Sequence, residues 1–452
     1  MIIRRNVLRL AIPLMVEQLF IILLGVCNTM MAGYIGEEAM AAIGMVDSMN
    51  NVFISVFASL SVGATVVVAQ HIGKDNGGKV NETVKQALVS GIILAAIITL
   101  LMWVFRETLI NSFYGSATEL VKQYAKIYIE FTLLTYPFIA IEQISVGILR
   151  GCGDVKTPMY ITIFMNIINL ILGFILIIGL NINILGINIH IESFGILGAA
   201  LAIGIARLIG TIIILFILIK GTTYIRLRKV FPFKFKTEIQ KSIFNIGIPA
   251  GVEQVLFNAG KFIVQIFIVT MGTTSIASNT IGMSIASMIN VLGNSFALAA
   301  ITLVGQYVGR GDIKGAKNTL IYLTKFSTVC IVILGIIVLP IAPFLASLYS
   351  DNSEIIALSA RLIRADSIAM IIWPISFVLS AGLKGAGDTR YTMVTAIIGM
   401  WIFRIFIGYV LGVVLKFGVL GIWIGMFSDW LVRGIMYSVR LRGDKWIKHR
   451  IQ

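Results

Sequence analysis

The sequence predicts an all-α polytopic membrane protein in which twelve transmembrane helices form two six-helix lobes. Its composition, its apolar segments and an internal repeat support this prediction. Of the 452 residues, 58% are hydrophobic and 13% are charged, and the mean hydropathy is +0.96. A soluble domain carries about a quarter charged residues. Apolar runs of about 20 residues, long enough to cross a hydrocarbon core as a helix, recur along the whole chain.

These apolar runs define the predicted spans. We expect them near residues 10–33, 48–70, 86–105, 125–148, 159–181, 195–219, 244–270, 284–307, 322–346, 365–383, 393–415 and 418–439. The first run follows Arg4, Arg5 and Arg9 and is longer than the apolar core of a secretory signal, so we interpret it as an uncleaved helix.

The basic residues lie mainly on one side of this predicted bundle. The chain has a net charge of +15, and 25 of its 36 Lys and Arg residues fall in segments predicted to share one face of the membrane. Such an excess is typical of cytoplasmic loops, so both termini are predicted to be cytoplasmic. The basic residues are spread over many loops without interleaved aromatic residues, which argues against nucleic acid binding.

The sequence gives no sign of catalytic chemistry. Its three cysteines and three histidines are far apart, so their spacing suggests neither a disulfide framework nor a metal site. We therefore predict no enzyme activity and no metal.

The two halves of the chain repeat each other. IPLMVEQLF from Ile12 matches IPAGVEQVLF from Ile248, and VAQHIGK from Val68 matches VGQYVGR from Val304. These matches predict an amino-terminal lobe (1–219) and a carboxy-terminal lobe (243–452), joined by a basic cytoplasmic linker at 220–242. Because six spans is an even number, both lobes enter from the same side, so their pseudo-twofold axis should run along the membrane normal and a cavity should lie between them.

A short polar motif also occurs twice, as LRGCGD from Leu149 and LKGAGD from Leu383. We interpret both copies as structural turns inside the cell rather than as substrate sites. Gly151 and Gly385 belong to turns whose glycines permit tight, positive-φ geometry. Asp154 and Asp388 are expected to cap the helix that follows each turn.

Several motifs resemble those of the multidrug and toxic compound extrusion (MATE) family. They are NTMMAGYIGEEAMAAIGM, VGQYVGRGDIKGAK and the two L-[RK]-G-x-G-D turns, and the similarity covers nearly the whole chain. The sequence is nearer the NorM-like and DinF-like bacterial branches. This resemblance implies a secondary antiporter in which Na⁺ or H⁺ entry drives the export of small organic, often cationic, compounds by alternating access.

The same resemblance implies a bacterial or archaeal inner membrane as the location. We expect the protein to act as a monomer in the lipid bilayer, with no cofactor other than the coupling Na⁺ or H⁺.

Intramembrane carboxylates are the first candidates for the coupling site. A charge at the centre of a membrane helix costs about 2.5–3.5 kcal/mol, so such groups usually face a cavity or a partner. Glu17 and Glu253 occupy matching places in the two lobes. Asn28 lies eleven residues after Glu17, about three helical turns, and should share its face. Asn258 should lie near the face of Glu253. For both glutamates, a structural hydrogen bond between helices is an equal alternative.

Three further residues are secondary candidates: Glu142, Lys261 and Asp366. Glu142 lies near the inner turn, where a structural role is favoured. Asp429 has Arg433 four residues later, a spacing that favours a local ion pair over a coupling role.

The family pattern is not fully reproduced. The resemblance implies acids in the first, seventh and tenth spans, at positions where this chain has Asn28, Phe257 and Trp373. Glu17 and Glu253 could replace these acids, or the coupling could differ.

Pro137 and Pro374 occupy similar places in the fourth and tenth spans. Proline removes a helix hydrogen bond and clashes with the preceding turn, so both should bend their helices. The bends could be hinges or static.

Three other functions were weighed. A lipid-linked oligosaccharide flippase of the same wider superfamily would need a more cationic cavity. A channel would need a selectivity ring, and an intramembrane enzyme would need a catalytic cluster; the sequence suggests neither.

Overall fold

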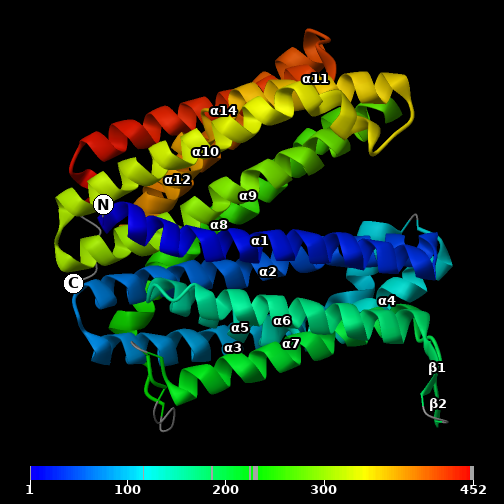
Figure 1. Cartoon of the computed structure of the whole chain (residues 1–452), viewed down its shortest axis with the longest axis horizontal. Coiled ribbons are helices and arrows are strands. Elements are labelled where there is room, and N and C mark those ends of the chain that lie inside the picture. Colours follow the sequence, from blue (N-terminus) through cyan, green and yellow to red (C-terminus); the bar gives the residue numbers. More distant parts are fainter. Residues whose placement is uncertain (1, 116, 185–186, 223–224, 228–232, 448–452) are drawn as a thin grey trace.

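The computed structural model describes residues 2–115, 117–184, 187–222, 225–227 and 233–447. Almost all of them are helical. Figure 1 shows two helical bundles that lie together at the end where α1 begins and α14 ends, and that diverge toward the other end. We call these the terminal end and the opposite end of the molecule.

Each lobe consists of six spans in the same order. The N-lobe contains α1 (Ile2–Ile35), α2 (Glu37–Gly73), α3 (Gly77–Tyr114), α4 (Glu119–Leu134), α5 (Tyr136–Gly151), α6 (Lys156–Gly173), the π-helical η1 (Phe174–Ile178) and α7 (Gly195–Lys220). The C-lobe contains α8 (Thr237–Val269), α9 (Thr273–Arg310), α10 (Ile313–Ser347), α11 (Ser353–Ala369), α12 (Trp373–Gly385), α13 (Thr389–Ile397), the π-helical η2 (Ile398–Ile407) and η3 (Val410–Val414), α14 (Gly418–Arg442) and the short 3₁₀ helix η4 (Lys445–Ile447).

The predicted number of spans is confirmed within the described residues. Ten helices are long and apolar enough to cross a membrane, and two bent helix pairs raise the number to twelve. The helices extend beyond the apolar runs that predicted them: α2 has 37 residues and α9 has 38. Their polar ends therefore reach past a hydrocarbon core that about 20 helical residues can cross.

The two bent pairs are α4 with α5 and α11 with α12, and the prolines explain their position. The axes change direction by 50° and 55°, and Pro137 and Pro374 lie in the first turn of α5 and α12. Proline is tolerated there because the first helical N–H groups have no partner within the helix. The predicted bends are confirmed, as complete breaks rather than kinks.

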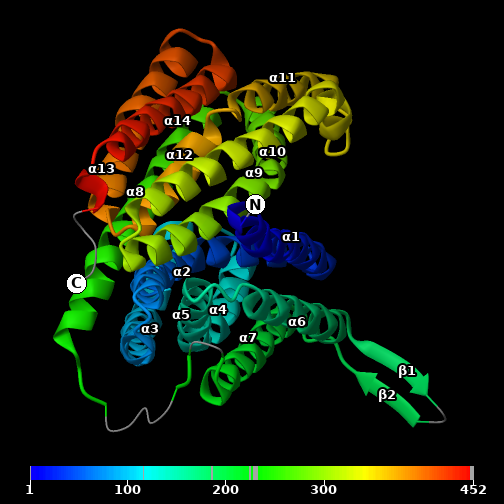
Figure 2. The same ribbon diagram turned by 60° about the vertical axis from the view of Figure 1, so that its left-hand side comes forward.

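A small hairpin, missing from the all-helical prediction, follows η1. Strands β1 (Leu180–Ile184) and β2 (Ile187–Ile191) pair antiparallel, with Leu180 opposite Ile191. Figure 2 shows the hairpin projecting from the bundle. The segment NINILGINIHIES lies between the predicted fifth and sixth spans, and isoleucine alternates there with polar residues, which is the period of a strand.

The two lobes touch along α2, α8 and α9. A Cβ added to Gly63 of α2 would lie 2.5 Å from the Ile243 carbonyl oxygen of α8. Gly73 and Gly309 face each other's helices so closely that a side chain on either would strike the backbone of Gln306 or Gln70. Small residues let membrane helices approach to backbone contact. The terminal end is therefore closed by direct packing of α2 on α9.

Candidate functional site

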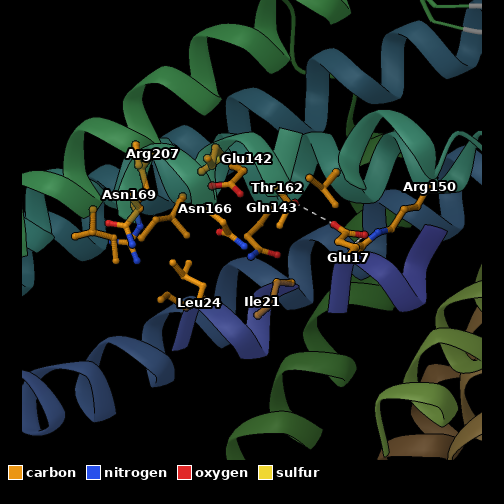
Figure 3. Close-up of a pocket in the computed structure, with 16 residues that line it drawn as sticks. Glu17, Ile21, Leu24, Glu142, Gln143, Arg150, Thr162, Asn166, Asn169 and Arg207 are labelled. Atoms are coloured by element: carbon orange, nitrogen blue, oxygen red, sulfur yellow. Dashed lines mark hydrogen bonds and ion pairs between the residues drawn. The ribbon is translucent and has the colours of Figure 1, made fainter. Parts of the chain in front are cut away.

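The N-lobe encloses a pocket of about 240 Å³ between α1, α5, α6 and α7 (Figure 3). Apolar residues form much of its wall, and its charged residues come from three helices. The polar lining residues are Glu17, Glu142, Gln143, Arg150, Thr162, Asn166, Asn169 and Arg207. Two carboxylates thus share this pocket with two guanidinium groups.

Glu17 is tied to two other helices. Its Oε2 lies 2.9 Å from Nη2 of Arg150 on α5, and its Oε1 accepts a hydrogen bond of 3.1 Å from the Thr162 hydroxyl of α6. The structural alternative considered for Glu17, a contact between helices, is therefore present. An ion pair so deeply buried fixes the two helices against each other and lowers the cost of burying either charge.

Asn28 shares the face of Glu17, as its spacing predicts. Asn169 of α6 donates a hydrogen bond of 3.0 Å to the Asn28 side-chain oxygen, and Asn166 donates one of 3.2 Å to the Phe20 carbonyl. A row of polar groups on α6 therefore faces α1 along the pocket.

Glu142 lies inside the pocket, not at its edge. In Figure 3 its carboxyl group lies between Arg207 and Asn169 on one side and Thr162 and Glu17 on the other. The residue is half-buried, and within the described residues it forms no hydrogen bond or salt bridge. The expected structural role for Glu142 near the inner turn finds no partner here. Glu142 is the carboxylate of this pocket that is available for a ligand.

Arg207 of α7 is a pocket residue that the sequence analysis did not predict. It lines the same pocket, and its Nη1 donates a hydrogen bond of 2.8 Å to the Thr135 hydroxyl at the break between α4 and α5. A single arginine in an otherwise apolar 26-residue helix was the available signal, because intramembrane charges usually mark a functional or paired site.

The C-lobe repeats the contact made by Glu17. Glu253 of α8 pairs with Nζ of Lys384 on α12 at 2.8 Å, and the Thr392 hydroxyl of α13 lies 3.5 Å from its Oε2. We call Glu17, Arg150 and Thr162 the N-lobe triad, and Glu253, Lys384 and Thr392 the C-lobe triad. The internal repeat thus preserves the acid and the base. A hydroxyl of the following helix completes each triad, but from a different position: Thr162 lies eight residues after Asp154, and Thr392 lies four after Asp388.

A larger cleft lies between the lobes. It has a volume of about 1030 Å³, and its wall comes from α2, α8 and the end of α12. Among its lining residues, Lys384 is the one with a titratable side chain, and the other polar groups are Ser48, Asn51, Ser55, Ser59, Gln254 and Asn258.

Asn258 does not share the face of Glu253, so that prediction is wrong. Asn258 lines the cleft, whereas Glu253 faces Lys384 and Thr392. Five residues turn a helix by about 140°, which separates the two side chains. Lys261, eight residues after Glu253, is turned from it by about 80° and contacts Phe257.

Charged residues also meet inside the C-lobe. Asp429 pairs with Arg433 at 2.8 Å, as the sequence predicts, and with Arg404 of η2 at 3.3 Å, a partner that the sequence did not reveal. The guanidinium groups of Arg404 and Arg433 lie 5.3 and 5.4 Å from the ring centre of Phe257, and Lys261 Nζ lies 5.1 Å from it. The position where the resemblance implied an acid is therefore surrounded by cations.

Trp373, at the other C-lobe position where an acid was implied, stacks on Phe377 with ring centres 4.3 Å apart. Asp366 lies in α11 and is 1% exposed. Neither of its carboxylate oxygens has a hydrogen-bond partner in the part of the chain that the structure describes. Asp366 is thus a buried acid that has no salt bridge among the described residues.

The duplicated turns lie where the lobes meet. Gln306 of the C-lobe donates a hydrogen bond of 3.0 Å to the Gly151 carbonyl, and Gln70 of the N-lobe donates one of 3.2 Å to the Gly385 carbonyl. We call these two reciprocal contacts the glutamine latch. Gly153 and Gly387 have φ values of 86° and 95°, so the predicted positive-φ turns are confirmed.

The two turn aspartates differ. Asp154 accepts a hydrogen bond of 3.1 Å from the Thr157 backbone N–H and so caps α6. Asp388 makes no side-chain cap to α13, so that prediction is wrong; it binds Arg440 of α14, with Nε 2.7 Å from Oδ2. The arginine on α14 is a stronger partner for a carboxylate than a backbone N–H.

No group of three or more His, Cys, Asp or Glu side chains among the described residues could hold a metal ion. The three cysteines form no disulfide.

The fold and its sites define a class: a multi-pass membrane protein whose two pseudo-symmetric six-span lobes enclose a cleft with apolar and polar lining residues. The model of one family, MatE, matches residues 13–175 and 249–410, one segment in each lobe. The chain belongs to the MatE family.

Similar proteins agree with this assignment. The chain is 26% identical to the "Probable multidrug resistance protein NorM" of Thermotoga maritima, over 99% of this chain and 94% of that protein. One solved structure, the outward-facing conformation of a multidrug resistance MATE family transporter, has a TM-score of 0.87 at 22% identity and covers 97% of this chain and 95% of its own. A transporter of Pyrococcus furiosus, described as having a binding pocket of reverse polarity, gives the same scores and coverage.

Proposed function

We propose that this protein is a secondary active efflux transporter that exports small organic compounds in exchange for Na⁺ or H⁺. Family membership and the NorM relative support transport of such compounds. The excess of basic residues at the terminal end supports an orientation in which both termini lie in the cytoplasm of a bacterial or archaeal cell. The cleft between the lobes then faces outward, since the terminal end is closed.

One observation carries the coupling role: Glu142 lines the N-lobe pocket without a hydrogen bond or salt bridge from the described residues. Arg207 shares this pocket but forms no salt bridge with Glu142 among the described residues. A carboxylate at this depth that has no bonded partner is suited to bind a proton or a cation. Oxygen atoms of Gln143, Thr162 and Asn169 lie around the same pocket and could complete a cation site.

The other predicted coupling residues have narrower roles in this proposal. Glu17 and Asn28 hold α6 against α1 and so shape the pocket. Glu253 fixes Lys384, which lines the substrate cleft together with Asn258. Asp366 is a second proton-binding candidate, because its buried carboxyl group has no hydrogen-bond partner among the described residues.

In the proposed cycle, an outward-open form takes up the cation and releases the compound, and an inward-open form does the reverse. Each ligand shifts the two forms only by its difference in affinity for them. The breaks before Pro137 and Pro374 are the proposed hinges.

The test is dye transport in proteoliposomes under an imposed Na⁺ gradient and then under an imposed pH gradient. Ethidium tests the predicted cationic substrates. We expect one gradient to drive uphill transport by the wild type. Glu142→Gln should abolish uphill transport while leaving downhill movement of the dye.

Glu130→Gln is the matched control. Glu130 lies in the same lobe and pairs with Arg106 at 2.9 Å, outside the pocket. It should retain coupling. Uphill transport by Glu142→Gln at the wild-type rate would contradict the assignment of the coupling site. Glycolipid translocation without any dye transport would favour the flippase instead.

A further inference from the structure

The interior of the C-lobe carries more positive than negative charge. Arg404 and Arg433 share the single carboxylate of Asp429, at 3.3 and 2.8 Å. Lys261 adds a third cation over the ring of Phe257, the same ring that both guanidinium groups approach. We call Lys261, Arg404 and Arg433 the cation cluster. The single negative charge of Asp429 can balance only one of the three positive charges of the cation cluster.

Hydrogen-bonding capacity is also left over. Arg433 is 3% exposed, and its Nη2 has no hydrogen-bond partner within the described residues. A buried guanidinium N–H without a partner is costly, so this group is suited to an acceptor that arrives with a ligand. Arginine presents its N–H groups in a planar fork that matches a carboxylate or a phosphate.

The cluster can be reached from outside the lobe. Lys261 is exposed and Phe257 is half-buried, so the row they form on α8 leads from the surface of the lobe toward the buried arginines. Phe377, also half-buried, lies on the other side of Arg433, whose guanidinium carbon is 4.6 Å from its ring centre. Phe377 also stacks on Trp373, so its faces are taken up by Arg433 and Trp373. Phe257 is therefore the ring that can offer flat apolar contact to a ligand beside the charged groups.

The N-lobe pocket differs in the balance of its charges. There, Glu17 and Glu142 match Arg150 and Arg207 in number. A cationic guest could enter the N-lobe beside Glu142, whereas in the C-lobe it would meet a surplus of like charge.

We propose that the cation cluster, together with Phe257, is a binding site for the anionic group of a transported compound, a carboxylate, sulfonate or phosphate attached to an aromatic body. The acid group binds the buried arginines and Lys261, and the aromatic body packs against Phe257. This inference deepens the proposed function, on which it rests, by naming a substrate class.

The experiment compares two dyes that share a xanthene ring system. Fluorescein is an anion at neutral pH and rhodamine 6G is a cation. Binding of each to the purified full-length protein in neutral detergent is measured by fluorescence polarisation without any ion gradient. We expect the wild type to bind fluorescein more tightly than rhodamine 6G.

Lys261 offers the safest variants because its side chain is exposed and is not part of the buried ion pairs. Lys261→Gln should weaken fluorescein binding about tenfold or more, the effect of losing one charged hydrogen bond, while Lys261→Arg should retain it. Rhodamine 6G binding should not weaken in Lys261→Gln. Lys325→Gln, which removes another exposed C-lobe lysine, on α10, is the matched control and should bind both dyes like the wild type.

A lipid headgroup could supply the same chemistry. Nanodiscs of phosphatidylcholine with and without phosphatidylglycerol separate the sources: displacement of fluorescein by phosphatidylglycerol identifies an anionic lipid, and displacement by benzoate alone identifies a free organic acid. Either result supports the anion site.

The proposal is overturned if wild type and Lys261→Gln bind fluorescein equally, or if rhodamine 6G binds more tightly than fluorescein. Because binding is measured without a gradient, this failure is distinct from a failure of coupled transport in proteoliposomes.

Discussion

The two lobes share their framework but differ in their interiors. The N-lobe triad and the C-lobe triad join equivalent helices, and the glutamine latch repeats one contact in each direction. Deeper in the lobes the likeness ends. Each lobe has an acid without a salt bridge among the described residues, Glu142 in the N-lobe and Asp366 in the C-lobe, but three cations gather around one acid, Asp429, in the C-lobe.

This difference suggests which parts of a duplicated transporter are constrained. The contacts that close the terminal end must fit both lobes at once, so they keep the symmetry of the repeat. In the proposed function the interiors face different ligands, so they are free to diverge. We infer a division of labour in which the N-lobe binds the coupling cation and the C-lobe binds an anionic group.

The largest expected effect concerns the buried charges that distinguish the lobes. Asp429→Ala should lower the free energy of unfolding by about 3–5 kcal/mol, because it leaves Arg404 and Arg433 buried without a counter-charge. Glu142→Gln in the N-lobe should cause no loss, since that carboxylate has no salt bridge to break within the described residues. Thermal unfolding in detergent measures both.

A matched variant separates charge from packing. Asp429→Ala combined with Arg433→Met should recover part of the lost stability, because one unpaired charge is removed. Equal unfolding temperatures for Asp429→Ala and Glu142→Gln would remove the proposed contrast between the two interiors.

The triads should differ by a smaller amount. The side chain of Glu17 is 2% exposed and that of Glu253 is 13% exposed. Glu17→Gln should therefore cost about 1.5–3 kcal/mol, the range for hydrogen bonds to charged groups. Glu253→Gln should cost no more than about 1 kcal/mol, as expected for a pair nearer to solvent.

The same two variants test the predicted coupling roles in proteoliposomes. If both pairs are structural, the variants should change stability without changing which ion gradient drives transport. A change of the driving ion in Glu17→Gln would assign Glu17 to the coupling site directly.

Local spacing made part of these sites predictable. The shared face of Glu17 and Asn28 and the pairing of Asp429 with Arg433 follow from helical geometry within one element. Arg404 reaches Asp429, and Arg150 reaches Glu17, only when separate helices pack in one particular register. Sequence spacing does not encode that register.

The internal repeat made the two-lobe fold predictable, but it also led to one wrong prediction, the helix cap by Asp388. Asp154 and Asp388 look equivalent in the sequence, yet an arginine on α14, Arg440, captures only the second. In both lobes the turn leads into the fifth span. In the C-lobe the sixth span, α14, also places Arg440 beside the turn aspartate. Tertiary contacts thus override a local capping signal where a stronger partner lies within reach.

The smallest expected effect concerns the glutamine latch, where the lobes should behave alike. Gln70→Ala and Gln306→Ala each remove one hydrogen bond across the lobes, worth about 1 kcal/mol, so each should shift the equilibrium toward an open terminal end about fivefold. Cys152 reports this opening, because it is 5% exposed and lines a cavity at the terminal end with Gln306. Burial also raises the pKa of the Cys152 thiol. Because the thiolate is the reactive form, Cys152 should react slowly while the terminal end is closed.

The measurement is labelling of Cys152 by a membrane-impermeant maleimide in inside-out vesicles, with Cys27 and Cys330 replaced by alanine. Gln306 lines the cavity around Cys152, so its variant could expose the thiol locally, whereas Gln70 binds the other turn, at Gly385. Equal acceleration of Cys152 labelling in both variants therefore indicates that the whole terminal end opens. Faster labelling in Gln306→Ala alone would show that the two contacts of the glutamine latch act separately. The lobes would then differ in the contacts that close the terminal end as well as in their interiors.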